Sequence, residues 1–390
     1  MKVLFVGVTY PIETFIERLI KGLLNKNVEI LIASNNQPNK NKLTHKNLKY
    51  LYLFNSKSTL SQKAYWLFTT TFFSLSTQPR NISTLLTSLF KGKRQAIEFT
   101  NKSIFKKLQW DVTYFPWNSA AIKYQFLFNF KQATIISCRG AQINIAPHNP
   151  RRHSIKKGLI ETFSKASAVH CVSKAILTEA TSFYLDPKKT SIIRPAINTK
   201  LFAPNQHPIQ TPLKIITTGS LIWRKGYEYS LLALQLLKKE GIPFEYIIIG
   251  DGPDHQRIQF TIFDLDLGGS VQLLGNLNTN TVRDYLRKSD IFLFSSLSEG
   301  ISNAILEAMA CEVVVVSTDC GGTNEVIQNG INGYLTPLRD PISQFRHLKS
   351  LSQNPSLIKT LGKNARKKIL ESHQIENQIK SFYNLFKKHT

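Results

Sequence analysis

The stretch from Ile291 to Ser317 reads IFLFSSLSEGISNAILEAMACEVVVVS and decides the fold class. Ile291–Phe294 and Val313–Ser317 are short apolar runs, typical of strands that are buried on both faces of a parallel sheet. Between them, a turn that contains Gly300 leads into a helix that we predict over Asn303–Cys311. A strand, a helix and a second strand in succession predict a βαβ unit and therefore an α/β protein.

The same alternation extends through the rest of the second half of the chain. We predict strands at Leu213–Thr218, Tyr246–Ile249 and Val271–Leu274, and helices at Glu228–Lys239, Asp254–Phe263 and Thr279–Lys288. Sheets of this kind bind ligands at the carboxyl ends of their strands. The loops expected to bind a ligand are those directly after Thr218, Ile249, Leu274, Phe294 and Ser317.

The first half begins with a βαβ pattern of its own. We predict strands at Lys2–Gly7, Val28–Ala33, Ala133–Cys138 and Ala168–Val172, and a helix from Ile12 to Leu24. The region from Ser56 to Gln109 is basic and aromatic, and it is predicted to be a mostly helical insertion. Prolines gather between Pro195 and Pro212, which indicates a domain boundary there.

The net charge of +25 belongs almost entirely to the first half. Residues 1–200 hold 30 Lys and Arg against 8 Asp and Glu, a balance of +22, whereas residues 201–390 hold 20 against 17, a balance of +3. Nucleic acid, an anionic membrane leaflet and an acidic substrate would each suit such a surface. Aromatic residues among the basic ones, as in Lys63–Trp66 and Phe90–Arg94, favour a membrane surface over nucleic acid. The alternative is a solvated positive surface with no partner.

No signal peptide or membrane span is predicted. The apolar run Val3–Val8 is too short for a signal peptide, and the longest uncharged stretch, between Lys63 and Arg80, is rich in Ser and Thr. We therefore expect a cytoplasmic protein, with peripheral attachment to the inner face of the membrane as a further possibility. The four cysteines are scattered, which predicts buried thiols in a reducing compartment, and no histidines have metal-binding spacing.

The helix predicted to begin near Ser302 offers free backbone N–H groups and the positive end of its dipole, which suit an anion such as a diphosphate. Glu299 stands just before this helix and Glu307 lies within it. Carboxylates repel phosphate but accept hydrogen bonds from hydroxyl groups, so the pair could hold a sugar and a ribose. The alternative is that Glu299 is an ordinary acid at a helix start and Glu307 a surface residue.

Glu299 and Glu307 are separated by seven residues and followed by Ala-Met-Ala-Cys and a valine-rich strand, and this segment resembles glycosyltransferase family four (group 1). The resemblance implies a GT-B fold, with two Rossmann-like domains whose parallel sheets face a deep cleft. It implies an acceptor-side domain over residues 1–205, a donor-binding domain over 206–372 and a helix over 373–390 that crosses back to the first domain. It also implies that Glu299 contacts the sugar, that Glu307 binds the ribose, and that the phosphates are held by Gly300, Ile301, Ser302 and Asn303.

Arg224 and Lys225 follow the first strand of the second half, where fixed cations would stabilise the charge of a departing nucleoside diphosphate. The family's pattern has an arginine where this chain has Ser220. Either Arg224 supplies the missing guanidinium, or phosphate binding is weaker here.

Other loops resemble the donor-binding turns of the family, because glycine allows the backbone to approach a ligand closely. Asp251 is equally well explained as a turn residue, and Gly321–Gly322 is expected to form a wall of the donor pocket. The donor-binding residues predicted in these turns are Gly219, Ser220, Gly250, Asp251, Gly252, Gly275 and Asn276.

The first half resembles the family less closely. The segment Pro11–Ile16 is similar to one in exopolysaccharide glycosyltransferases, which places Glu13 and Thr14 on the acceptor or phosphate side. Arg139 stands in a Cys-Arg-Gly segment where many members have a histidine. It is predicted to bind phosphate or an anionic acceptor in place of that histidine.

The resemblance implies a retaining glycosyltransferase that transfers a sugar from a nucleotide-sugar donor to a glycan or lipid-linked acceptor, with no metal or other cofactor, in the synthesis of cell-surface polysaccharide. Its predicted catalytic residues are Glu299, Arg224, Lys225 and Arg139. Two alternatives are a sugar-nucleotide epimerase of the same fold and a catalytically degenerate partner recruited to a membrane.

Overall fold

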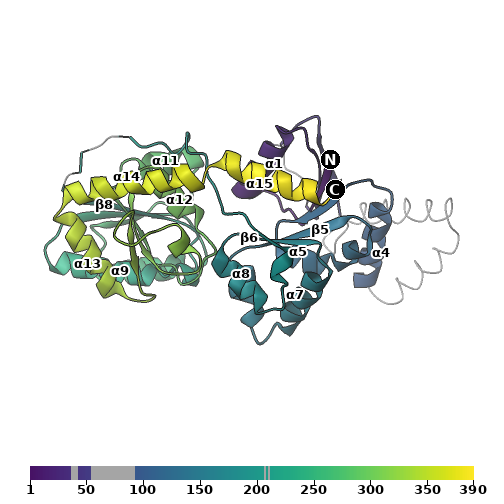
Figure 1. The fold of residues 1–390 in the computed structure, drawn as a ribbon. Coiled ribbons are helices and arrows are strands. Elements are labelled where there is room, and N and C mark those ends of the chain that lie inside the picture. The colour runs from purple at the N-terminus through teal and green to yellow at the C-terminus, as the bar shows by residue number, and fades with distance from the viewer. Residues whose placement is uncertain (37–42, 54–92, 206–207, 210) are drawn as a thin grey trace.

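The computed structural model describes all residues except 37–42, 54–92, 206–207 and 210. The described residues form two parallel β-sheets, each with helices packed on both faces, and the two units lie end to end (Figure 1). The α/β class and the two-sheet architecture predicted from the sequence are confirmed.

In the part of the chain that the structure describes, the N-terminal sheet has seven strands in the order β3-β2-β1-β4-β5-β6-β7, and each of these pairings is parallel. The order runs outward in both directions from β1, as in a Rossmann sheet. Its strands are β1 (Lys2–Val6), β2 (Glu29–Ser34), β3 (Leu48–Tyr52), β4 (Val112–Phe115), β5 (Ala133–Cys138), β6 (Ala168–Cys171) and β7 (Thr190–Ile192). Its helices are α1 (Thr14–Leu24), α4 (Lys93–Phe105), α5 (Asn118–Lys123), α6 (Ala141–Asn144), α7 (His153–Lys165) and α8 (Lys174–Thr181).

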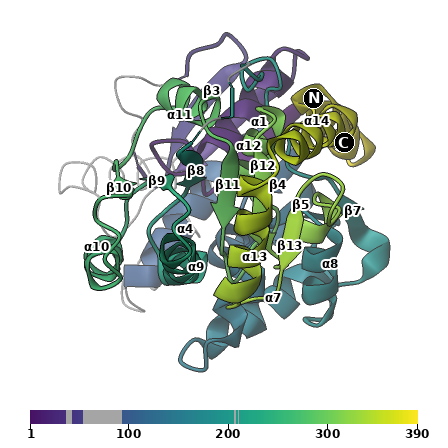
Figure 2. The ribbon, with the colours of Figure 1, turned by 90° about the vertical axis from the view of Figure 1, so that its left-hand side faces the viewer.

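The C-terminal sheet has six parallel strands in the order β10-β9-β8-β11-β12-β13 (Figure 2). Its strands are β8 (Leu213–Thr218), β9 (Phe244–Ile249), β10 (Val271–Leu273), β11 (Ile291–Phe294), β12 (Val314–Thr318) and β13 (Tyr334–Thr336). Its helices are α9 (Tyr227–Lys239), α10 (His255–Asp264), α11 (Thr279–Leu286), α12 (Asn303–Ala310), α13 (Pro341–Ser352) and α14 (Pro355–Ser372). Central strands β11 and β12 are buried along their whole length, which explains their continuous apolar sequences.

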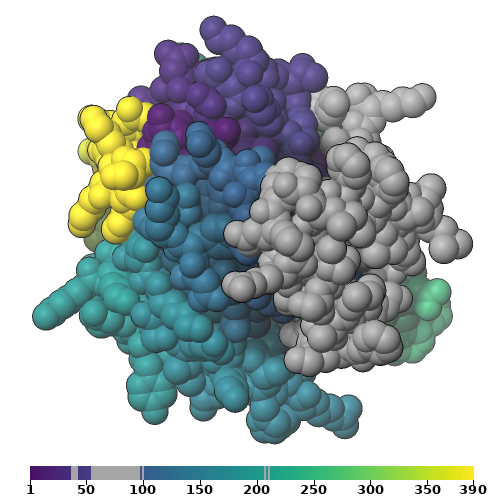
Figure 3. Space-filling view, turned by 90° about the vertical axis from the view of Figure 1, so that its right-hand side faces the viewer, coloured from purple at the N-terminus to yellow at the C-terminus, as the bar shows by residue number. Residues whose placement is uncertain are grey.

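The last helix, α15 (Ile375–Lys388), leaves the C-terminal unit and packs on the N-terminal one, beside the first residues of the chain (Figures 1 and 3). Its Phe382, Leu385 and Phe386 are buried in the N-terminal core. The Phe386 ring lies 5.2 Å from the ring of Tyr114 and 6.4 Å from that of Phe5, in edge-on geometry. Within the described residues, the chain therefore crosses between the units after β7 and again after α14.

The two crossings lie side by side and are hydrogen-bonded to each other. Ile197 of the first pairs with Gln374 of the second in a single parallel β-bridge. The Ile197 amide donates to the carbonyl of His373 at 3.0 Å, and His373 Nδ1 donates to the carbonyl of Pro195 at 2.8 Å. These bonds join the crossings into one connection.

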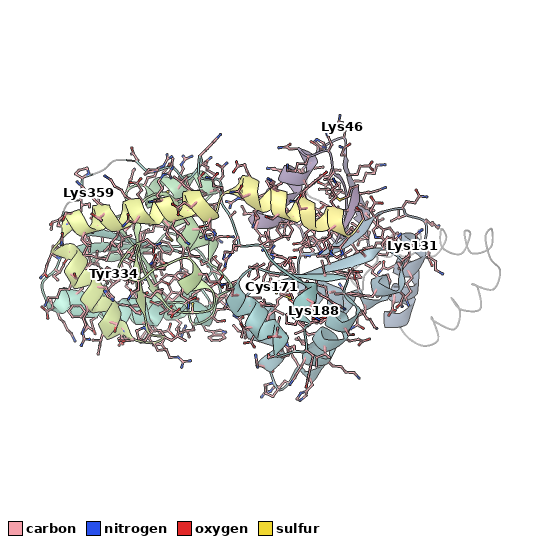
Figure 4. The ribbon with its side chains drawn as sticks, viewed as in Figure 1. Lys46, Lys131, Cys171, Lys188, Tyr334 and Lys359 are labelled. Atoms are coloured by element: carbon pink, nitrogen blue, oxygen red, sulfur yellow. The ribbon has the colours of Figure 1, made fainter. Side chains whose placement is uncertain are left out.

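The strands predicted from the sequence are present to within two residues, and the first predicted helix begins at Thr14 because Glu13 is still extended. Strands β3, β4, β7 and β13 were not predicted. Most of the helical insertion expected between Ser56 and Gln109 lies outside the described residues, and α4 is its described end. All four cysteines are buried free thiols, as predicted, and Cys171 lies within β6 (Figure 4).

We predict that Phe386→Ala lowers the free energy of unfolding by about 3–5 kcal/mol, because the phenyl ring is fully buried against the rings of Phe5, Tyr114 and Phe382. Urea denaturation of the whole chain measures the change. Phe263, which is 78% exposed, is the matched control, and Phe263→Ala should stay within about 0.5 kcal/mol of the unsubstituted protein. Equal losses in the two variants would show that α15 does not depend on this contact.

Candidate active site between the two domains

A cavity of about 540 Å³ lies between the carboxyl ends of the two sheets. Both units contribute to it: loops after β1, β4 and β5 on one side, and the loops after β8 and β11 on the other. Its lining includes Glu13, Arg139, Arg224, Glu299, Gly300, Ile301 and Asn303. The structure thus brings residues from both halves of the sequence to one place.

Lys225 and Glu299 form the central ion pair of this site. Lys225 Nζ lies 2.5 Å from Glu299 Oε1, and it also lies over the ring of Phe294 at 4.8 Å from the centroid. Ser296 Oγ donates a second hydrogen bond to Glu299 Oε1 at 2.9 Å. The side chains of Lys225 and Glu299 are only 12% and 11% exposed, so the pair is largely shielded from water.

The charge of Glu299 is fixed by its surroundings. Burial alone would raise the pKa of this carboxyl, but Lys225 and then Arg224 outweigh burial and hold the pKa below its ordinary value. The backbone carbonyl of Arg224 also holds the loop in place, because it accepts a hydrogen bond from the Leu297 amide. Glu299 is therefore a carboxylate at neutral pH, suited to accept hydrogen bonds rather than to donate a proton.

Helix α12 begins at Asn303, and Ser302 precedes it without a capping hydrogen bond from its side chain. The amide groups of its first turn therefore remain available to an anion. Gly300 approaches the other unit closely: a Cβ at this position would lie 2.8 Å from Val172 and 3.2 Å from the Gly140 amide nitrogen. Only glycine lets the Glu299 loop touch the N-terminal unit this closely.

Glu307 does not line the cavity that contains Glu299. It pairs across the two units with Arg18 of α1, at 3.3 Å between Nη2 and Oε1, and both side chains are 16% exposed. Burial raises the pKa of Glu307, and Arg18 counters only part of this effect. Arg18 and Thr14 line a second cavity, of about 760 Å³. Glu13 and Thr14, which are adjacent in the sequence, therefore line different cavities.

Arg139 lines the cavity that contains Glu299, and its guanidinium carbon lies 4.2 Å from the ring centroid of Phe15. Its Nε donates to Ser137 Oγ at 2.9 Å. Because Gly140 has a φ of +39°, the chain turns sharply after Arg139. The cation is thereby held on the N-terminal side of the cleft, across from the loop of Glu299.

The glycine loops predicted to bind the donor pack against one another at the edge of the C-terminal sheet. Gly250 packs on the carbonyl of Gly219, and its amide donates to the carbonyl of Gly275. Asp251 accepts a hydrogen bond from the Gly252 amide at 2.7 Å, which is the turn role considered as its alternative. Ser220 and Asn276 are exposed.

Several residues at the domain interface were not found from the sequence. Arg18 contacts Glu307, and Asn144 donates to the Glu299 carbonyl at 3.2 Å. Glu325 pairs with Arg194 and accepts from the Lys174 amide at the start of α8. Gly321 and Gly322, expected to form a wall of the pocket, pack against the backbone of Glu299 and Gly300. None of these long-range contacts has a local signal in the sequence.

Among the described residues, no group of three or more His, Cys, Asp or Glu side chains is arranged to hold a metal ion. Within the same residues, no helix has the length and apolar character needed to cross a bilayer.

The fold is that of the GT-B glycosyltransferases. Sucrose-phosphate synthase from Thermosynechococcus elongatus superposes with a TM-score of 0.78 at 15% identity, covering 99% of this chain and 98% of that one. HepE from Anabaena in complex with UDP superposes with a TM-score of 0.74 at 15% identity and covers 100% of both chains. At these identities the likeness establishes the fold alone.

The sequence of the C-terminal unit is similar to known glycosyltransferases. Residues 200–368 match the family described as "Glycosyl transferases group 1", which confirms the resemblance found from Glu299 and Glu307. The amylovoran biosynthesis glycosyltransferase AmsK of Erwinia amylovora is 30% identical over 61% of this chain and 59% of its own length. The putative colanic acid biosynthesis glycosyltransferase WcaL of Escherichia coli is 30% identical over 49% of each chain. The chain spans about half the length of these relatives.

We predict that Lys225→Met destabilises the protein by about 3–5 kcal/mol at pH 7.5, because it leaves the Glu299 carboxylate buried without its partner. Without Lys225, burial raises the pKa of Glu299 above its unfolded value, so the penalty applies when the group is ionised and fades as the pH falls toward about 4. In the unsubstituted protein the pKa is lowered, so the stabilisation by Glu299 is present at neutral pH and is lost on acidification. The gap between the two melting temperatures should therefore narrow from pH 7.5 to pH 4.

Calorimetry of both proteins across this range measures the gap. The matched control is the double variant Lys225→Met/Glu299→Gln, which has no buried charge at this pair and should lose most of the pH dependence. A gap that stays constant with pH would contradict the assignment of this ion pair.

Proposed function

We propose that this protein is a retaining glycosyltransferase that transfers a sugar from a nucleotide-sugar donor to a glycan or lipid-linked acceptor in the synthesis of cell-surface polysaccharide. The observation that carries the proposal is the inter-domain cavity. There Glu299, which is paired with Lys225, and the start of α12 lie opposite Arg139 of the other unit. The names of AmsK and WcaL, both polysaccharide-biosynthesis glycosyltransferases, support the product class. HepE has been solved with UDP-glucose, which supports a nucleotide-sugar donor.

Departure of the donor's nucleoside diphosphate is the step that this chemistry would assist. Negative charge develops on the leaving phosphate, and fixed positive groups that face it lower the barrier. Arg224 lines the cavity on the C-terminal side, and Lys225 lies directly behind it, paired with Glu299. We propose that these cations and the free amides of α12 supply such groups. Glu299, an acceptor of hydrogen bonds, would orient the sugar hydroxyls. We propose that the leaving phosphate accepts the acceptor's proton on the same face of the sugar, which retains the anomeric configuration and requires no metal ion.

The acceptor and the place of reaction are proposed on the charge of the first half. A lipid-linked acceptor at the inner face of the membrane would suit a surface with an excess of 22 positive charges over residues 1–200. Lys46, Lys131 and Lys188 lie on different sides of the N-terminal unit (Figure 4). Sedimentation with vesicles of neutral and anionic lipid tests the membrane part: binding independent of anionic lipid would remove it without affecting the transferase proposal.

A panel of UDP-, GDP-, ADP- and CMP-sugars identifies the donor, because a ligand that binds only the folded state raises the melting temperature. The nucleotide-sugar that binds is then incubated with the protein and acceptor fractions, with and without EDTA, and the release of nucleoside diphosphate is measured. We expect release of nucleoside diphosphate that depends on the acceptor and persists in EDTA. NMR of the product should show that the anomeric configuration of the donor is retained. Conversion of the donor without any acceptor would indicate an epimerase, and binding to anionic vesicles without release would indicate a degenerate partner.

We propose that the Glu307 carboxylate accepts a hydrogen bond from the ribose of the donor, as the resemblance implies. We predict that Glu307→Ala weakens binding of the donor nucleotide at least 10-fold, because loss of a hydrogen bond to a charged group costs about 1.5–3 kcal/mol. Isothermal titration with the nucleotide selected by the panel measures the change. Glu371, an exposed residue of α14, provides the matched control, and Glu371→Ala should bind as the unsubstituted protein does. Unchanged affinity in Glu307→Ala would assign Glu307 to its ion pair with Arg18 alone.

A further inference from the structure

The guanidinium of Arg139 is the end of a chain of hydrogen bonds that runs into the core of the N-terminal unit. Arg139 Nε lies 2.9 Å from Ser137 Oγ, and Ser137 Oγ lies 2.7 Å from His170 Nδ1. His170 Nε2 in turn lies 2.8 Å from the carbonyl oxygen of Ile193. Ser137 and His170 are 0% exposed and are direct partners in the register of β5 and β6.

The direction of these bonds follows from their end points. The carbonyl of Ile193 can only accept, so His170 Nε2 has the proton of the neutral ring and Nδ1 has a free lone pair. Ser137 then donates its hydroxyl proton to Nδ1, and its oxygen accepts from Arg139, which can only donate. Burial, reinforced by the charge of Arg139, lowers the pKa of His170 to about 3, so the ring stays neutral. Each member of the chain thus has one defined role.

The first inter-domain crossing and the helix that follows the second crossing contact the same histidine. Phe382 of α15 packs edge-on against the His170 ring with centroids 4.7 Å apart. Ile193 begins the first crossing, and its neighbour Arg194 pairs with Glu325 of the C-terminal unit at 2.7 Å. The inner end of the chain is therefore fixed to the connection between the units, and its outer end is the cation in the cleft.

We propose that Ser137 and His170 are positioning residues, which hold Arg139 over Phe15 as a fixed cation directed at the anionic part of the substrates. This inference rests on the proposed function, in which Arg139 faces the donor diphosphate or an anionic acceptor. An oriented cation costs nothing to reorganise when charge develops, whereas a free arginine side chain must first be ordered. The ordinary explanation is that Ser137 and His170 only satisfy each other inside the core, and that Arg139 needs neither of them.

A double-mutant cycle separates the two explanations. Ser137→Ala removes the link, and we expect it to weaken binding of inorganic pyrophosphate and of the donor nucleotide about 10-fold, because the freed arginine side chain must then be ordered when the ligand binds. In an Arg139→Gln background the same substitution should change affinity less than 2-fold, because there is no guanidinium left to position. Equal losses in both backgrounds would overturn the proposal. Thr134→Val, which removes another buried hydroxyl from β5, is the control and should leave affinity unchanged.

Crystal structures supply a readout that does not depend on the transferase assignment. In Ser137→Ala we expect the Arg139 guanidinium to leave the face of Phe15, and in Thr134→Val we expect it to stay. An unmoved guanidinium in Ser137→Ala overturns the positioning role, whatever the protein binds. If the unsubstituted protein binds neither pyrophosphate nor any nucleotide, the proposed function fails, and the crystal structures still decide whether Ser137 and His170 position Arg139.

Discussion

The ion pair between Lys225 and Glu299 is the interaction on which the site depends. Without a partner, burial would raise the pKa of a carboxyl this well shielded from water, and a protonated Glu299 could no longer accept hydrogen bonds equally through both oxygens. The pair also joins the loop after β8 to the loop after β11, two neighbouring strands at the centre of the C-terminal sheet. Cation, carboxylate and the start of α12 therefore keep one arrangement because one buried contact fixes all three.

This arrangement exists only because the sheet is parallel. Parallel strands deliver all their following loops to the same edge, so residues 74 positions apart, such as Lys225 and Glu299, meet without any special device. The N-terminal sheet likewise brings Glu13 and Arg139, which follow different strands, to one edge. The cavity forms where the edges of the two sheets face each other. Gly300 permits the contact, since any side chain there would hold the units apart.

Much of this could be predicted, because the informative signals were local. Continuous apolar runs such as Ile291–Phe294 mark central strands, and the spacing of Glu299 and Glu307 falls within one strand–helix unit. Strands such as β13 escaped prediction because they are three residues long and only partly buried. Arg18 escaped because its partner is 289 residues away, and nothing on an amphipathic helix marks one exposed-looking arginine as an inter-domain contact. The chain from Arg139 to His170 likewise depends on strand register, which periodicity does not give.

The paired crossings have a mechanical consequence. Two covalent connections that lie together and are bonded at Ile197, His373 and Gln374 resist sliding of one unit past the other more than they resist rotation about the axis of the paired segments. Sliding the two sheet edges past each other would instead have to shear that β-bridge and pull Phe382 and Phe386 from their pocket. A ligand that contacts both units across the cavity would therefore restrict this rotation, because it would join the two sheet edges at a point distant from the rotation axis.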